Sequence, residues 1–213
     1  MDPRFVHPYT AIVSGPTGSG KTQFVKRLIE RGNTAVTDPP EKILWLYGEY
    51  QSTYDGMRNS MDNIQFIEGF PSDMDALIDP RVRNLVVIDD LMTELSGDAR
   101  VTNLFTKGSH HRNMSVIFIV QNLFLSSKQF RTISLNAHYM VLFKNPRDNS
   151  QIIHLAKQIF PGRVKFVQES FMDATANQYG YLLVDLRPTT PEDLRLRTDI
   201  FHGLRQTVYV PRV

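Results

Sequence analysis

Seven short apolar runs, most of them continuous rather than alternating, constrain the fold of this chain more than any other feature. Strands that are buried on both faces have this pattern, as in a parallel sheet covered by helices. Helical periodicity lies between the runs, at Lys21–Arg31, Asp98–Lys107 and Ser150–Phe160. The alternation predicts an α/β domain with a mostly parallel central sheet flanked by helices. The runs are Ala11–Val13, Ile43–Tyr47, Ile64–Ile67, Leu85–Ile88, Val116–Val120, Tyr139–Phe143 and Tyr181–Leu186.

The totals of the sequence favour one domain. The chain has 213 residues, of which 41% are hydrophobic and 22% are charged. This length suffices for one core, so we expect a single domain, 1–213, with its core at about residues 8–187. After Leu186 the periodicity fades, and the tail carries five arginines against three acids. We interpret residues 188–213 as a solvated C-terminal arm, with a partner-binding arm as the alternative.

The composition excludes several classes of protein and site. The chain has no cysteine, which excludes disulfides and thiolate metal sites. No apolar run approaches the roughly 20 residues that a membrane span needs. The amino terminus lacks the apolar region of a secretory signal, so we expect neither secretion nor a membrane partner. The net charge of +2 is far from the strong basic excess of proteins held to DNA by bulk charge, so any nucleic-acid contact must be local.

A glycine-rich segment joins the first apolar run to the first helical pattern. Its spacing, Gly15-x-x-x-x-Gly20-Lys21-Thr22, is that of a complete phosphate-binding loop. Glycines let backbone amides turn toward phosphate oxygens, and the helix start adds the positive end of its dipole. We predict that Lys21 binds the β- and γ-phosphates and that Thr22 ligates Mg²⁺. The predicted nucleotide-binding residues are Gly15, Pro16, Thr17, Gly18, Ser19, Gly20, Lys21 and Thr22.

Two adjacent carboxylates end the run Leu85–Ile88. An aspartate pair is unusual at the end of a buried strand, because an unpaired buried charge is unfavourable. A phosphate loop needs a carboxylate on a neighbouring strand for the Mg²⁺ shell, and Asp89 is in the position for it. Asp90 is then the predicted general base. NTPases of the additional-strand class usually have Glu there, and Asp is one methylene shorter. The alternative is that Asp90 caps the following turn.

Two further polar side chains belong to the predicted site. Gln121 ends the strand Val116–Val120, at the position where additional-strand NTPases carry a sensor of the γ-phosphate or the attacking water. Arg112 lies just before that strand and is a candidate to reach the active site of a neighbouring subunit. The alternatives are an ordinary polar strand end for Gln121 and a solvated basic loop around Arg112. The adjacent His110 and His111 have no carboxylate at helical spacing, so a metal site there is not expected.

Three motifs follow one another along the chain: GPTGSGKT, then LVVIDD, then HHRN directly before VIFIVQN. In this order they resemble the motifs of the FtsK–HerA superfamily of ring ATPases. Within it the chain is similar to the poxvirus-type genome-packaging ATPases, including those of Polinton-like elements, on the phrases NPRDNSQI and PEDLRLRTDIF. The resemblance covers about residues 8–201. Much of the superfamily carries Asp-Glu where this chain has Asp89-Asp90.

The resemblance implies a P-loop NTPase of the additional-strand, RecA-like class, with Lys21, Asp90, Gln121 and Arg112 as catalytic residues. It further implies ATP and Mg²⁺ as cofactors and a homo-oligomeric ring, expected to be a hexamer, that threads double-stranded DNA into a capsid. A capsid or portal protein would be a further partner. The location would be the site of virion assembly, in the host nucleus or a cytoplasmic factory, or the virion.

Other functions stay open at this point. A helicase-like translocase has the same nucleotide site, and a nucleotide or small-molecule kinase has the same loop. A non-catalytic switch that assembles on ATP is a third alternative, which the presence of both Asp90 and Gln121 disfavours. The chain lacks the Asn/Thr-Lys-x-Asp motif that reads guanine, which favours ATP over GTP.

Overall fold

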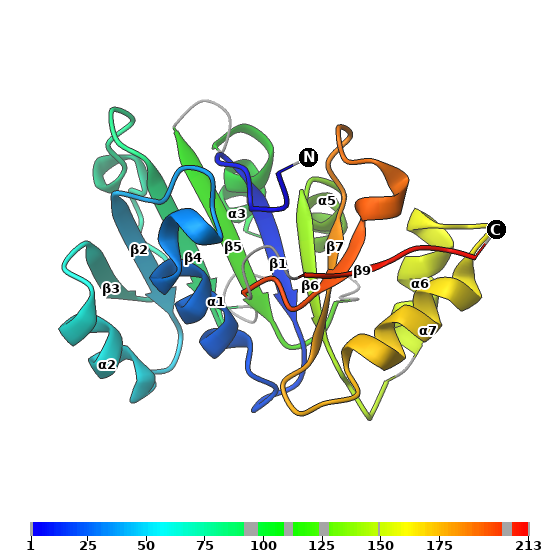
Figure 1. Cartoon of the computed structure of the whole chain (residues 1–213). Helices are drawn as coiled ribbons and strands as arrows, with labels where there is room; N and C mark the ends of the chain where they lie inside the picture. The colour runs from blue at the N-terminus through cyan, green and yellow to red at the C-terminus, as the bar shows by residue number, and fades with distance from the viewer. Residues whose placement is uncertain are drawn as a thin grey trace.

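The computed structural model describes residues 2–91, 98–108, 113–123, 128–148, 150–201 and 206–212. These residues form a nine-stranded sheet in the order β3-β2-β4-β5-β1-β6-β7-β8-β9 (Figure 1). The strands from β3 to β6 run parallel, and β7, β8 and β9 pair antiparallel. The strands are β1 Thr10–Ser14, β2 Lys42–Tyr47, β3 Ile64–Glu68, β4 Asn84–Asp89, β5 Met114–Val120, β6 Tyr139–Phe143, β7 Tyr181–Asp185, β8 Leu196–Thr198 and β9 Thr207–Tyr209.

Helices cover both faces of the sheet and bury two apolar clusters (Figure 1). On one face α1 and α2 pack through residues such as Val25 and Met57. On the other face α3, α5, α6 and α7 pack through residues such as Val101, Ile133 and Val167. The helices are α1 Lys21–Glu30, α2 Thr53–Ser60, α3 Ala99–Asn103, α5 Lys128–Leu135, α6 Ser150–Ile159 and α7 Val164–Ala174, with short 3-10 turns at Gly32–Thr34, Asp75–Leu77 and Glu192–Leu194 and a π turn at Leu104–Gly108.

The sequence prediction of a mostly parallel sheet flanked by helices is confirmed. Each predicted apolar run coincides with a strand, except that Leu186 of the last run lies just after β7, and β7 is antiparallel to its neighbour β6. Asp98 caps α3, since its carboxylate accepts the backbone N–H of Arg100 at 2.8 Å. Among the described residues no helix combines the length and apolar character needed to cross a membrane.

The strand order determines where the functional side chains lie. β5 is inserted between β1 and β4, which is the additional strand that the sequence predicts. Ser14 pairs with Val120, and Asp89 pairs with Ile119, so these three strands end side by side at one edge of the sheet. The residues that follow them, including Gly15, therefore meet at the carboxyl edge of the parallel strands.

The interpretation of the tail as a solvated arm is wrong for residues 196–198, 200 and 201. Residues 196–198 add β8 to the sheet, and Ile200 and Phe201 are buried against the face that α1 covers. Arg197 is only 3% exposed. The tail has little periodicity because its strands are only three residues long, so the sequence pattern gives no signal for them.

Candidate nucleotide-binding site

The loop between β1 and α1 has the conformation of a phosphate cradle. Gly18 and Gly20 have φ values of 77° and 100°, a left-handed region that favours glycine. A Cβ atom on Gly15 would lie 2.7 Å from both the Cβ of Phe143 and the Oγ of Ser19. The loop therefore needs glycine at all three positions. Gly18 and Gly20 are required for their positive φ values, and Gly15 is required because a side chain there would clash.

Two polar groups of the loop fit an anion. The Oγ of Ser19 is buried and has no hydrogen-bond partner among the described residues. The Lys21 ammonium, only 9% exposed, donates to the carbonyl oxygens of Gly15 at 2.7 Å and Pro16 at 2.9 Å, and burial lowers its pKa. The helix that starts at Lys21 adds unpaired backbone amides and its positive dipole end. Together these groups fit a phosphate.

Asp89, at the end of β4, is a buried carboxylate that hydroxyl groups surround. It is 2% exposed; the Tyr54 hydroxyl donates to its Oδ2 at 2.9 Å, and the Thr22 hydroxyl does so at 3.4 Å. The pKa of Asp89 is raised to about 6, mainly by burial and in part by the nearby Asp90, against the opposing effects of Tyr54 and Lys21. Thr22 and Asp89, the two predicted Mg²⁺ ligands, therefore lie together.

The pair fits the way Mg²⁺ binds in phosphate sites. Mg²⁺ there uses one or two protein oxygens and fills its octahedron with phosphate and water. Among the described residues no group of three or more His, Cys, Asp or Glu side chains forms a complete metal cage. Thr22 and Asp89 would hold the ion only when a nucleotide supplies the other ligands.

The predicted base and the predicted sensor are in direct contact. The Gln121 amide donates from Nε2 to Oδ1 of Asp90 at 3.1 Å. Asp90 has a φ of 56°, which is unfavourable for a non-glycine residue. A Cβ on Gly48 would lie 2.6 Å from the Asp90 carbonyl oxygen, so glycine is required for β2 and β4 to end this close together. The residues that an Asp90 cap would serve, 92–97, lie outside the described residues, so that alternative stays open.

A single cavity of about 860 Å³ joins these groups. Lys21, Thr22, Asp89, Asp90 and Gln121 all line it, so five predicted residues come together. On the other side of α1 the cavity continues along an aromatic and basic wall that the sequence did not predict. This wall includes Phe143, Tyr179, Tyr181, Phe201, Arg27 and Arg31.

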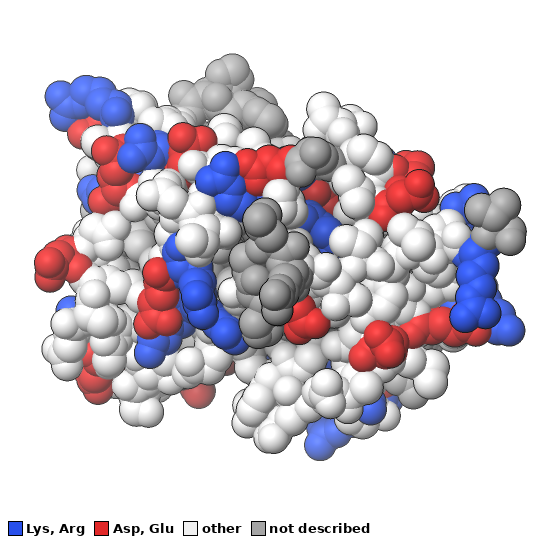
Figure 2. Space-filling view, in the orientation of Figure 1, with Lys and Arg blue, Asp and Glu red and all other residues white. Residues whose placement is uncertain are grey.

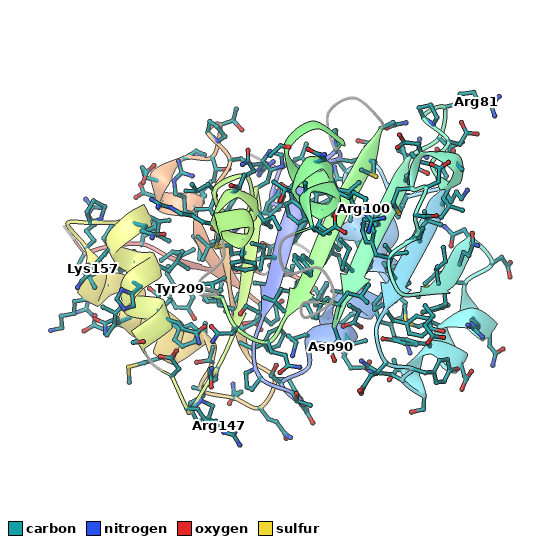
Figure 3. All side chains as sticks on the ribbon, turned by 180° about the vertical axis from the view of Figure 1, so that it is seen from behind. Arg81, Asp90, Arg100, Arg147, Lys157 and Tyr209 are labelled. Carbon is teal, nitrogen blue, oxygen red and sulfur yellow. The ribbon has the colours of Figure 1, made fainter. Side chains whose placement is uncertain are left out.

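The predicted finger Arg112 lies outside the described residues. Two other arginines, Arg131 and Arg147, are both exposed. Figure 3 shows Arg147 at the same edge of the sheet as Asp90, in the loop after β6. Among the described residues its guanidinium has no partner. Arg147 therefore has the place and exposure to reach a neighbouring molecule.

Tyr54 is the functional candidate that the sequence reasoning missed. The neighbouring aromatic residues Trp45 and Tyr47 are buried and belong to the core. Tyr54 is also fully buried, but its hydroxyl is turned to Asp89. The sequence carries no signal for this contact, because α2 and β4 are joined only by the fold.

Neither a protein-family model nor a curated protein matches this chain. Several solved structures match it. The genome packaging NTPase B204 of Sulfolobus turreted icosahedral virus 2 matches with a TM-score of 0.59 at 11% identity in a sulfate complex, over 97% of this chain and 98% of that chain. Its complex with ATP-gammaS matches with a TM-score of 0.58 at 14% identity, over 100% of both chains.

A second kind of ATPase matches as well. The cytoplasmic domain of the type VII secretion ATPase EccC from Thermomonospora curvata has a TM-score of 0.56 and 13% identity, over 89% of this chain and 25% of that chain. At such identities a likeness establishes fold and not function. This chain therefore shares the fold of these packaging and secretion ATPases.

Proposed function

We propose that this protein is an ATP-hydrolysing motor that translocates double-stranded DNA, and that it packages a viral or virus-like genome into a capsid. The observation that carries the hydrolysis step is the Gln121–Asp90 contact in the same cavity as Lys21 and Thr22. A general base and a polar amide beside a phosphate loop are what hydrolysis needs and what a passive nucleotide switch does not. The full-length fold match to a genome packaging NTPase supports the packaging role.

In the proposed reaction each residue has one task. Lys21 leaves the carbonyls of its own loop and neutralises the β- and γ-phosphates. Thr22 and Asp89 would hold Mg²⁺, which would supply positive charge to the phosphate oxygens. Asp90 accepts the proton of the attacking water while Gln121 orients that water. The backbone amides of the loop from Gly15 onward hold the triphosphate in the orientation that the attack requires.

The charges of the chain support a shared and local DNA contact. The net charge is only +2, and Figure 2 shows basic and acidic side chains interspersed over the face that it draws. The described residues form no broad basic surface on that face. A homo-oligomeric ring, a hexamer in our proposal, lets several subunits share the phosphate contacts, and the binding is then independent of base sequence.

In the same proposal the protein belongs to the poxvirus and Polinton-like branch of the FtsK–HerA superfamily. It acts where virions assemble, in the host nucleus or a cytoplasmic factory, or within the virion, and docks on a capsid or portal protein. An arginine of one subunit completes the site of the next. Arg112 is the first candidate for this role, and Arg147 is the second.

ATP hydrolysis with and without double-stranded DNA tests the function directly. We expect Mg²⁺-dependent turnover that DNA stimulates. Lys21→Ala should abolish turnover, and Asp90→Asn should bind Mg-ATP but hydrolyse it about 10²–10⁴-fold more slowly. Lys165→Ala, on the exposed face of α7, is the matched control. Turnover that ignores DNA and needs an acceptor would indicate a kinase, and binding without turnover would indicate a switch.

Mixing inactive variants tests the shared site. A Lys21→Ala subunit keeps its arginine, and an Arg112→Ala subunit keeps its phosphate loop. Each alone should be inactive, and a mixture should regain part of the activity, because some interfaces then pair an intact site with an intact arginine. If mixed rings form without recovery, Arg112 is not the finger, and Arg147→Ala is tested in the same way.

A further inference from the structure

An exposed tyrosine lies directly beside the phosphate loop. Tyr179 is in the loop between α7 and β7, which runs next to the β1–α1 loop at the lower edge of the sheet in Figure 1. Its side chain is 59% exposed and lines the large cavity. A tyrosine ring has an apolar face and a polar hydroxyl, a combination that is enriched at interfaces with ligands and partners.

The backbone of this loop has an unfavourable conformation at Tyr179. Tyr179 has a φ of 61°, in the left-handed region that glycine and asparagine favour. Its neighbour Gly180 donates its N–H to the carbonyl of Asn177 at 3.0 Å, which closes a tight turn. A Cβ on Gly180 would lie 2.5 Å from the carbonyl oxygen of Ala174, so no larger residue fits there. The turn therefore holds Tyr179 in one position in spite of its strained backbone.

That position is against the start of α1. A Cβ on Gly20 would lie 3.1 Å from Cδ1 of Tyr179 and 3.5 Å from its Cβ. Gly20 is the residue whose amide precedes Lys21 in the phosphate cradle. The tyrosine thus borders the phosphate site on the side away from Asp89 and Asp90, where the cavity continues toward Arg27 and Phe201.

The other exposed tyrosine of the cavity, Tyr50, is already engaged. Its ring packs against Tyr47 and Tyr54 at centroid distances of 6.0 and 5.6 Å, and its hydroxyl donates to Asp55. Among the described residues Tyr179 has no ring partner, no ion pair and no side-chain hydrogen bond. Its ring is therefore the one of the two that is available to a ligand.

We propose that Tyr179 is the platform on which the base of the bound nucleoside triphosphate stacks. The inference rests on the proposed function, because it assumes that a triphosphate occupies the β1–α1 loop with its γ-phosphate toward Asp90. The base then extends to the opposite side, where Tyr179 lies. Stacking on an aromatic ring is tolerant of base identity. Tyr179 thus contributes affinity for purine nucleoside triphosphates, and does little to separate adenine from guanine.

Two probes separate the base from the phosphates: ATP, and inorganic tripolyphosphate as a competitor that has no base. Tyr179→Ala should raise the KM and Kd for ATP about 10-fold, within the range known for loss of one stacking partner, with kcat within about 2-fold. The inhibition constant of tripolyphosphate should stay within about 2-fold. Tyr179→Phe keeps the ring and should resemble the wild type. Tyr209→Ala, the same change on β9 outside the cavity, is the matched control.

The outcomes separate the two proposals. Equal weakening of ATP and tripolyphosphate in Tyr179→Ala would mean that the ring supports the loop, and would overturn the stacking role. Unchanged affinity for both would place the base elsewhere and would overturn it as well. In either case the proposed function stands as long as the wild type hydrolyses ATP. A wild type that binds neither probe would overturn the proposed function, and the stacking role with it.

Discussion

Asp89 and Asp185 are two buried aspartates at strand ends, at opposite edges of the same sheet. Asp185 is fully buried, and it forms ion pairs with Arg187 at 2.7 Å and Arg197 at 3.0 Å. The Thr190 hydroxyl also donates to it at 2.8 Å. Asp89 is almost as buried, but its described partners are the hydroxyls of Tyr54 and Thr22.

The two acids differ in the source of the positive charge that each one needs. The chain supplies the positive charge that Asp185 needs, so this acid joins β7 to β8 and requires nothing from outside. For Asp89 the chain supplies neutral donors and only a more distant Lys21, and burial raises its pKa. A buried carboxylate without an adjacent cation is an unstable arrangement that a bound metal ion relieves.

The largest expected effect is on catalysis at Asp89. Asp89→Asn should lower the Mg²⁺-dependent rate about 10³-fold, because a metal ion contributes several kcal/mol at the transition state and 1.36 kcal/mol is tenfold. Steady-state ATPase assays over a Mg²⁺ series would measure it. Asp62→Asn, exposed and remote from the cavity, is the control. A variant with the full rate would show that Asp89 is not a ligand.

At Asp185 the main effect should be on stability. Asp185→Ala leaves two arginines without their acid, one of them buried, and should lower the free energy of unfolding by about 3–5 kcal/mol. The rate per folded molecule should not change. Urea denaturation would measure the loss. Asp79→Ala removes an acid with the same spacing to Arg81, but in an exposed pair, and should leave the midpoint nearly unchanged.

The pH dependence of stability should reveal the raised pKa of Asp89. The folded pKa is about 6 and the ordinary value is 3.8, so the stabilising contribution of protonated Asp89 is complete below 3.8 and lost as the pH rises through about 6. Asp89→Asn has no charge to bury. Without Mg²⁺ and nucleotide, it should therefore be more stable than the wild type at pH 8, by up to about 3 kcal/mol.

Denaturation curves at several pH values would follow this difference. It should shrink toward pH 4, where Asp89 of the wild type is protonated in the folded protein. A difference that stays constant from pH 4 to pH 8 would contradict the raised pKa.

The smallest expected effect is at Tyr54. Tyr54→Phe removes the hydroxyl that orients Asp89 and keeps the buried ring. Loss of a group that orients a metal ligand weakens metal binding 10–100-fold in known sites, and we expect the low end, about 10-fold, in the Mg²⁺ concentration for half-maximal activity. The rate at saturating Mg²⁺ should change little. Tyr50→Phe is the control, because its hydroxyl binds Asp55.

Features that depend on short segments of the chain were predictable from sequence. The phosphate loop, the strand ending in Asp89-Asp90 and the strand ending in Gln121 each combine a motif with an apolar run, and the parallel strand order brings their ends together. The proximity of these groups follows from a general property of parallel sheets. The sequence therefore predicted which of these side chains lie together in the cavity.

Contacts between remote segments were not predictable. Tyr54 reaches Asp89 only because α2 packs against β3 and brings its first turn to the end of β4, and Tyr179 reaches Gly20 only because β7 returns antiparallel to β6. The tail was misread for the same reason, since β8 is a strand only in the presence of β7. The dipeptide Tyr179-Gly180 before an apolar run was a turn signal, but the sequence does not say what the turn approaches.

The position of Arg197 has a consequence for the order in which the protein is completed during synthesis. Its guanidinium donates to the carbonyl oxygen of Pro3 at 2.5 Å and to Asp185 at 3.0 Å. A chain made from its amino end has already exposed Pro3 and Asp185 before Arg197 leaves the ribosome. The strands from β1 to β7 have been synthesised by then. The contact of Pro3 with Arg197 is therefore one of the last contacts that the protein forms.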